Sequence, residues 1–171
     1  MTNTISKQNL SLLILLDVSV LLIVYFIPAF IHATAFPLYY LEPMRVLLFS
    51  AYLISRNIKN AYILALTLPL VSTLLPPFHP PFYKAVIMSI ELFTNIAVFY
   101  WLLNKLKWQA GIIIFISTIL SKILYYLLKF IFINIGLIEG SLISTSLLLQ
   151  LLTLTVLSIL FAFVFKRRLE Q

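Results

Sequence analysis

Long apolar runs, separated by short polar or proline-rich segments, make up nearly the whole chain. Leucine and isoleucine dominate these runs, which favours helices over the alternating strands of a barrel. About 20 apolar residues are enough to cross a bilayer as a helix. The pattern predicts six transmembrane helices, at approximately 10–31, 38–56, 59–75, 83–104, 110–133 and 142–165. The second run spans a bilayer only if its helix begins near Leu38.

Composition narrows the class of protein. The 171 residues are 63% hydrophobic and 10% charged, whereas soluble domains are about 45–50% apolar and about 25% charged. We therefore expect an all-α integral membrane protein in which residues 1–171 form a single membrane domain. The chain has no cysteine, which excludes disulfides and thiolate sites. We expect neither a cofactor nor a metal site.

The net charge of +7 is concentrated at alternate ends of the apolar runs. Cytoplasmic loops of membrane proteins carry an excess of lysine and arginine. The alternation predicts that both termini are cytoplasmic in a multi-pass protein of a prokaryotic inner (plasma) membrane. We interpret these charges as topology signals, and we do not expect nucleic-acid binding. The basic residues concerned are Lys7, Arg56, Lys59, Lys105, Lys107, Lys166, Arg167 and Arg168.

Polar side chains recur at helical spacing inside two of the runs. Lys84, Glu91 and Asn95 follow the offsets i, i+7 and i+11, which place them on one helical face. Thr118, Lys122, Tyr125 and Lys129 follow the same rule in the fifth run. Charged groups within a membrane are expensive, and they usually face a polar cavity or the interior of a bundle.

These two faces predict a binding site in the outer half of the bundle. Glu91 could pair with Lys122 or Lys129, which would leave an excess of positive charge for an anionic ligand group. His79 lies in a proline-rich loop at the mouth of this expected cavity, and Tyr40 is a candidate for stacking. The candidate substrate-binding residues are Lys84, Glu91, Asn95, Lys122, Tyr125, Lys129, His79 and Tyr40.

Purely structural roles account for several of the same residues. Lys84 and Lys129 lie near helix ends and could extend to the membrane surface. Glu91 could form a structural ion pair, and Asn95 could bridge two helices. Tyr40 and Tyr125 are as typical of an interfacial aromatic belt as of a ligand site.

Several short motifs follow one another between Pro37 and about Leu103. In order they are Leu41-Glu42-Pro43-Met44-Arg45, Arg56-Asn57, Ala61-Tyr62-Ile63-Leu64-Ala65, Leu68-Pro69-Leu70-Val71-Ser72, His79-Pro80, Lys84 and Glu91-Leu92-Phe93-Thr94-Asn95. The series resembles the substrate-binding S component of energy-coupling-factor (ECF) vitamin transporters, and more narrowly an uncharacterised branch of that family.

The resemblance implies a six-helix bundle that captures a small vitamin-like solute from outside the cell and performs no catalysis. Its implied partners are a transmembrane coupling subunit, two ATPase subunits and membrane lipid. The family's binding site is on the outer side, where the charged faces described above also converge.

Two other functions compete with substrate capture. A membrane scaffold of the MreD rod-shape type has a similar size and helix number, although the stretch 68–73 has neither the glycine nor the aspartate typical of that family. A small membrane enzyme could use Glu91 or His79 as a base, but no second catalytic group stands at a recognisable spacing. We therefore expect that the chain is not an enzyme.

Overall fold

The computed structural model describes residues 7–34, 41–74, 81–106, 108–143 and 146–169. The described ranges are helical apart from short connections, and none of them contains a strand, which confirms the all-α prediction. The helices are α1 (Lys7–Thr34), α2 (Pro43–Ser55), α3 (Ile58–Val71), the short 3₁₀ helix η2 (Ser72–Leu74), α4 (Phe82–Lys105), α5 (Ala110–Asn134) and α6 (Leu147–Leu169).

Within the described ranges, four helices are long and apolar enough to cross a membrane, which indicates a membrane protein. They are α1, through its segment Leu10–Ile27, α4, α5 and α6. The other two are shorter. At about 1.5 Å per residue, the 13 residues of α2 extend only about 20 Å, against a hydrocarbon core about 30 Å thick.

The predicted starts of two helices differ from the structure. In the run 38–56, residues 38–40 lie outside the described residues, and α2 begins at Pro43, where proline suits the first helical position and Glu42 before it adopts a left-handed conformation (φ 47°). In the run 142–165, residues 142 and 143 are not helical, residues 144 and 145 lie outside the described residues, and α6 begins at Leu147, after a connection in which Gly136 and Gly140 have positive φ. At the other end of the chain, α1 continues to Thr34, so residues 32–34 are helical and not part of a loop.

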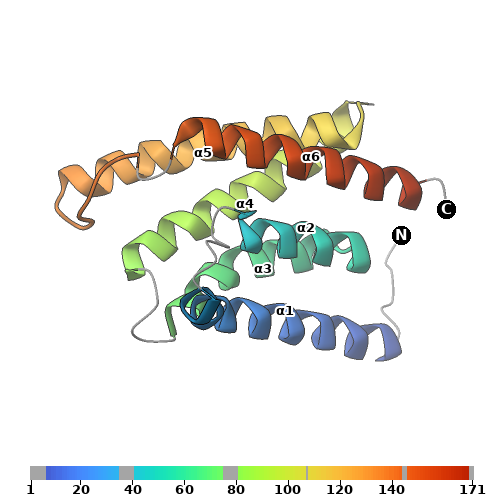
Figure 1. Cartoon of the computed structure of the whole chain (residues 1–171). Coiled ribbons are helices and arrows are strands. Elements are labelled where there is room, and N and C mark those ends of the chain that lie inside the picture. The colour runs from blue at the N-terminus through green and yellow to red at the C-terminus, as the bar shows by residue number, and fades with distance from the viewer. Residues whose placement is uncertain (1–6, 35–40, 75–80, 107, 144–145, 170–171) are drawn as a thin grey trace.

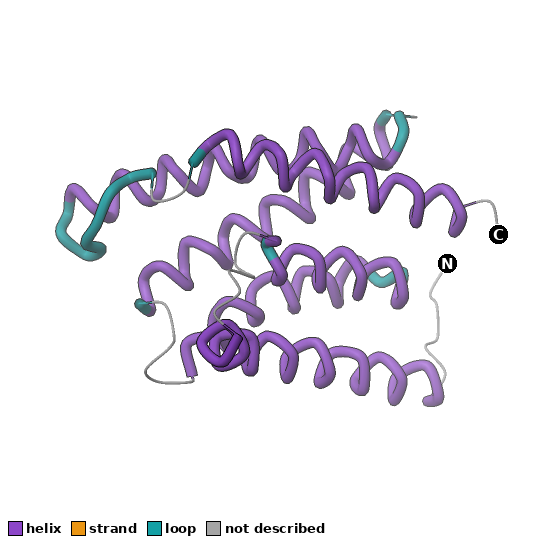
Figure 2. Tube along the Cα trace, in the orientation of Figure 1, coloured by secondary structure: helices purple, strands orange, loops and turns teal. Residues whose placement is uncertain are grey.

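Successive helices run in opposite directions, with α4 between two groups of helices (Figure 1). α4 packs against α3 on one side and α5 on the other, and α6 packs along α5. Figure 2 shows the same path as a tube, in which the start of α1, the end of α6 and the α2–α3 and α4–α5 connections all lie at one end of the molecule. We call this the terminal end and the opposite one the loop end.

An aromatic cluster joins α6 to α2 and α4 towards the terminal end. Phe49 and Phe99 are fully buried and meet edge to face, with ring centroids 5.1 Å apart. Phe161 lies 5.5 Å from Phe49, and Phe165 lies 5.5 Å from Phe99. Tyr52 completes the cluster at 5.8 Å from Phe99. Aromatic pairs at these distances, edge to face or tilted, add to the packing of three helices.

A small-residue contact brings α5 and α6 together in the same region. A Cβ atom placed on Gly111 would lie 2.7 Å from Cβ of Ala162 and 3.0 Å from the carbonyl oxygen of Ser158. Small residues allow membrane helices to approach closely and gain van der Waals contact. Glycine is therefore required at this crossing.

Polar contacts attach α3 to α1 and to α4. Asn60 donates a hydrogen bond to Asp17 of α1, with a nitrogen–oxygen distance of 2.7 Å. Pro69 has no N–H and so leaves the carbonyl of Ala65 without its usual helical donor. The hydroxyl of Ser89 on α4 donates to the adjacent carbonyl of Leu66 at 2.9 Å. α4 thus donates to the carbonyl that follows the one left without a donor by Pro69.

Candidate functional site

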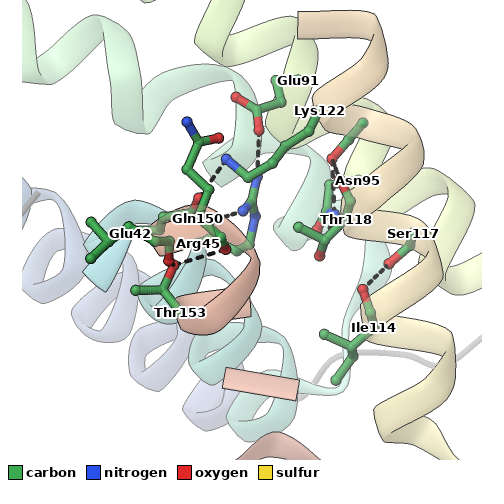
Figure 3. A network of polar contacts seen from close by, with 12 residues as sticks. Glu42, Arg45, Glu91, Asn95, Ile114, Ser117, Thr118, Lys122, Gln150 and Thr153 are labelled. Carbon is green, nitrogen blue, oxygen red and sulfur yellow. Dashed lines mark hydrogen bonds and ion pairs between the residues drawn. The ribbon is translucent and has the colours of Figure 1, made fainter. Parts of the chain in front are cut away.

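Four charged side chains meet inside the bundle (Figure 3). The guanidinium of Arg45 pairs through Nη2 with Oε1 of Glu91 and through Nη1 with Oε2 of Glu42. The amine of Lys122 lies 2.5 Å from Oε1 of Glu42. These two acids and two bases form the charge network, which has no net charge.

The charge network lies well below the loop end. Glu91 is about 14 Å along α4 from its first residue, and Lys122 is about 18 Å along α5 from its last, at about 1.5 Å per residue. The side chain of Arg45 is 4% exposed and that of Glu91 is 10% exposed. Taking such groups out of water is costly, and the mutual pairing offsets that cost.

The late start of α2 positions half of this network. Glu42 precedes the helix, and its carbonyl accepts hydrogen bonds from the backbone N–H groups of Arg45 and Val46, at 2.9 and 3.2 Å. The spacing i, i+3 places the side chains of Glu42 and Arg45 on the same side of this first turn. If the helix began near Leu38, Glu42 would lie inside a regular turn instead of at a left-handed N-cap.

A second polar layer lies one turn from Glu91 on α4. Asn95 is fully buried, and its side-chain nitrogen donates to the hydroxyls of Thr118 and Ser121 on α5, at 3.0 and 3.1 Å. The Asn95 side-chain oxygen has no hydrogen-bond partner among the residues that the structure describes. The Ser121 hydroxyl in turn donates to the carbonyl of Thr118 at 2.9 Å. Asn95 therefore bridges two helices, as the structural alternative predicted.

Lys129 has a structural contact nearer the loop end. Its amine donates to the carbonyl oxygen of Leu142 at 2.9 Å, and the residue is only 6% exposed. This contact secures the connection before α6 to α5. Lys129 therefore does not extend freely to the membrane surface. Lys84 is half-buried in the first turn of α4.

A groove between α5 and α6 lies beside the charge network. Its volume is about 220 Å³, and its walls are mostly aliphatic. Lys122 belongs both to this groove and to the charge network. The other polar groups in its lining are Tyr126 and Gln150, which are joined by a hydrogen bond of 2.8 Å from the tyrosine hydroxyl to Oε1. The lining residues are Ile119, Lys122, Ile123, Tyr126, Leu147, Gln150, Leu151 and Leu154.

The expected pairings of Glu91 are wrong. Glu91 pairs with Arg45, while Lys122 pairs with Glu42 and Lys129 with a backbone carbonyl. The charge network therefore lacks the excess of positive charge that the earlier pairing implied. The physical reason is that the short α2 brings its own arginine and glutamate into the space that α4 and α5 face.

The structure brings some of the predicted site residues together and separates others. Glu91 and Lys122 both belong to the charge network, and Asn95 lies in the next layer. Tyr125 stacks edge to face on Tyr126, with centroids 5.3 Å apart. Lys84 and Lys129 lie outside the network, and His79 and Tyr40 fall outside the described residues.

Sequence reasoning missed Glu42 and Arg45 as members of the site. Both stand near the start of the second apolar run, where charged residues usually face water. A usable signal was present: an acid and a base at spacing i, i+3 around a proline that begins an apolar run.

In comparisons with known proteins, no protein-family model, curated protein or solved structure matches the chain. In the part of the chain that the structure describes, no group of three or more histidine, aspartate or glutamate side chains could hold a metal ion.

Proposed function

We propose that this chain is a substrate-capture subunit, the S component of an ECF-type importer. It binds a small vitamin-like solute in the outer half of a membrane bundle and performs no chemistry on it. The observation that carries the proposal is the charge network, which is built from α2, α4 and α5 and buried near the middle of the bundle.

A buried network of this kind is a poor way to stabilise a scaffold. Well-packed apolar residues of similar volume often stabilise a protein as well as a buried ion pair does, or better. Ionisable residues inside membrane segments usually mark a ligand or ion pathway. The adjoining groove and the polar layer at Asn95 extend the set of groups that a solute could contact.

The direction of the helices supports the proposed topology. Arg56, Lys59 and Lys105 lie in or directly beside the α2–α3 and α4–α5 connections, at the terminal end of the molecule, where α1 also begins and α6 ends (Figure 1). We propose that this end faces the cytoplasm and that all six helices cross the inner (plasma) membrane of a prokaryote, with α2 as the shortest span. The charge network then opens towards the outside.

The proposed partners follow from the lack of a nucleotide-binding motif that could power transport in the 171 residues. No nucleotide-binding glycine-rich loop is present in the 171 residues. Uptake against a gradient would then depend on a transmembrane coupling subunit and two ATPase subunits that act on the capture subunit.

Native mass spectrometry of the gently purified full-length protein tests this function. We expect a co-purified small molecule in the wild type that is lost in Glu91→Gln, because the variant removes one partner of Arg45. The matched control is Glu139→Gln, an exposed acid in the α5–α6 connection, which should keep the compound. Wild-type protein that carries no compound but co-purifies with cell-shape proteins would contradict the proposal and favour the scaffold.

A further inference from the structure

Two cations from different helices converge on one carboxylate in the charge network. Oε2 of Glu42 pairs with Arg45 of α2, and Oε1 pairs with Lys122 of α5. We infer that Arg45 and Lys122 form a carboxylate-binding site, that Glu42 is its internal occupant, and that the substrate is a small monocarboxylate whose acid group replaces Glu42. The inference rests on the proposed function, since it names the chemical class of the captured solute.

The exposure of the two acids favours exchange at Glu42 over exchange at Glu91. The side chain of Glu42 is 17% exposed, whereas that of Glu91 is 10% exposed and that of Arg45 is 4% exposed. Once Glu42 leaves, Arg45 and Lys122 face Glu91 alone, with one net positive charge. A monoanion restores the balance, and a neutral solute leaves an unpaired cation in the bundle.

The backbone at Glu42 also distinguishes it from the other acid. Glu42 has φ 47° and ψ 57°, a left-handed conformation that is unfavourable for residues with a side chain. Such conformations persist where surrounding contacts impose them, and they concentrate at ligand sites and switches. Glu91 lies in the interior of α4, where regular helical hydrogen bonds hold its backbone.

The groove between α5 and α6 provides room for the rest of the molecule. Lys122 links the groove to the charge network, so an acid group held by Lys122 would place its apolar body against aliphatic walls. The volume of about 220 Å³ is below the range of about 300–1,000 Å³ that is typical of pockets for drug-sized ligands. A small acid with a compact apolar body fits this space.

Benzoate and benzamide form a matched pair of probes, since they differ mainly in charge. Isothermal titration calorimetry would measure both on the full-length protein in phosphatidylcholine nanodiscs. In Glu42→Gln, which removes the internal competitor, we expect benzoate to bind at least tenfold more tightly than in wild type, with benzamide unchanged. Glu139→Gln serves as the control and should bind both probes as wild type does.

Lys122→Met provides the second variant. In wild type and in Glu42→Gln alike, it should abolish the preference for benzoate over benzamide. Equal gains for both probes in Glu42→Gln, or a benzoate preference that survives Lys122→Met, would overturn the inference. If Glu42→Gln does not fold, the comparison of wild type with Lys122→Met decides the same question.

The acid could be a soluble solute or a fatty acid of the membrane. Adding oleic acid to the nanodisc lipid separates these sources. The absence of competition with benzoate supports a small soluble acid, whereas competition assigns the site to a fatty acid and overturns the small size of the substrate that the inference states. A neutral co-purified compound that depends on Glu91 would overturn this inference while leaving the capture function intact.

Discussion

Two neighbouring regions of the bundle are built from the same helices but by opposite means. Towards the terminal end, α2, α4 and α6 meet through Phe49, Phe99 and Phe161 in an apolar, closely packed cluster. One turn away along α2, Arg45 meets Glu91 of the same α4 in an ion pair. Within a single helix pair, packing is thus concentrated in one region and buried charge in the other.

This contrast indicates a division of roles. The aromatic cluster gains dispersion energy without any desolvation penalty for charge. The charge network must offset such a penalty before it stabilises anything. We therefore expect substitutions in the aromatic cluster to change stability with little effect on ligand binding, and substitutions in the charge network to change binding even where stability is restored.

The largest expected effect is at the centre of the aromatic cluster. Phe99→Ala removes a fully buried ring that contacts Phe49, Tyr52 and Phe165, and should lower the free energy of unfolding by about 4 kcal/mol. Denaturant titration in mild detergent measures this loss. Phe130→Ala, at a ring that is 54% exposed, is the control and should change stability little. A loss of the bound compound from folded Phe99→Ala protein would contradict the division of roles.

A smaller loss is expected when the charge network loses one member. Arg45→Met leaves Glu91 without its cation and should destabilise the protein by about 3 kcal/mol. The double variant Arg45→Met with Glu91→Leu removes both charges and should recover most of that stability, since Glu42 keeps Lys122 as its partner.

The same double variant sharpens the comparison between the two regions. It should remain unable to hold the co-purified compound in native mass spectrometry, even though its unfolding midpoint approaches that of wild type. Retention of the compound by the double variant would assign the Arg45–Glu91 pair a structural role only.

The smallest of these effects is expected at the α5–α6 crossing. Gly111→Val adds side-chain atoms against Ala162 and should cost about 1–3 kcal/mol through overpacking. Because the crossing is on the side of the aromatic cluster, ligand retention should be unchanged in the folded fraction. The unfolding midpoint of Gly111→Val, compared with that of Ile112→Val at a neighbouring side chain that is 48% exposed, measures the effect. A midpoint equal to wild type for Gly111→Val would show that the two helices can separate at no cost.

The sequence predicted α4 and α5 closely. The expected helices 83–104 and 110–133 agree with Phe82–Lys105 and Ala110–Asn134 to within one residue at each end. Long apolar runs bounded by proline or polar residues determine such helices locally. The spacing of polar residues within these runs also identified Glu91, Asn95 and Lys122 as groups that face the interior.

The starts of α2 and α6 were harder to predict, because an apolar run can continue beyond the helix that it contains. Residues 142 and 143 are apolar, yet they lie in a connection whose backbone receives the Lys129 amine at Leu142. Around α2, Pro43 and the left-handed Glu42 decide where the helix begins.

By itself, the sequence determined which segments are helical, that the chain is a membrane protein, and which faces of α4 and α5 carry polar groups. These properties depend on the composition and periodicity of neighbouring residues. Only the tertiary structure decided that Glu91 pairs with Arg45, 46 residues away along the chain, and that Lys122 pairs with Glu42. An acid on one helical face can reach any base that packing brings near it. The choice of partner depends on where each helix starts and how the helices cross. The periodicity of residues along one helix carries no information about either.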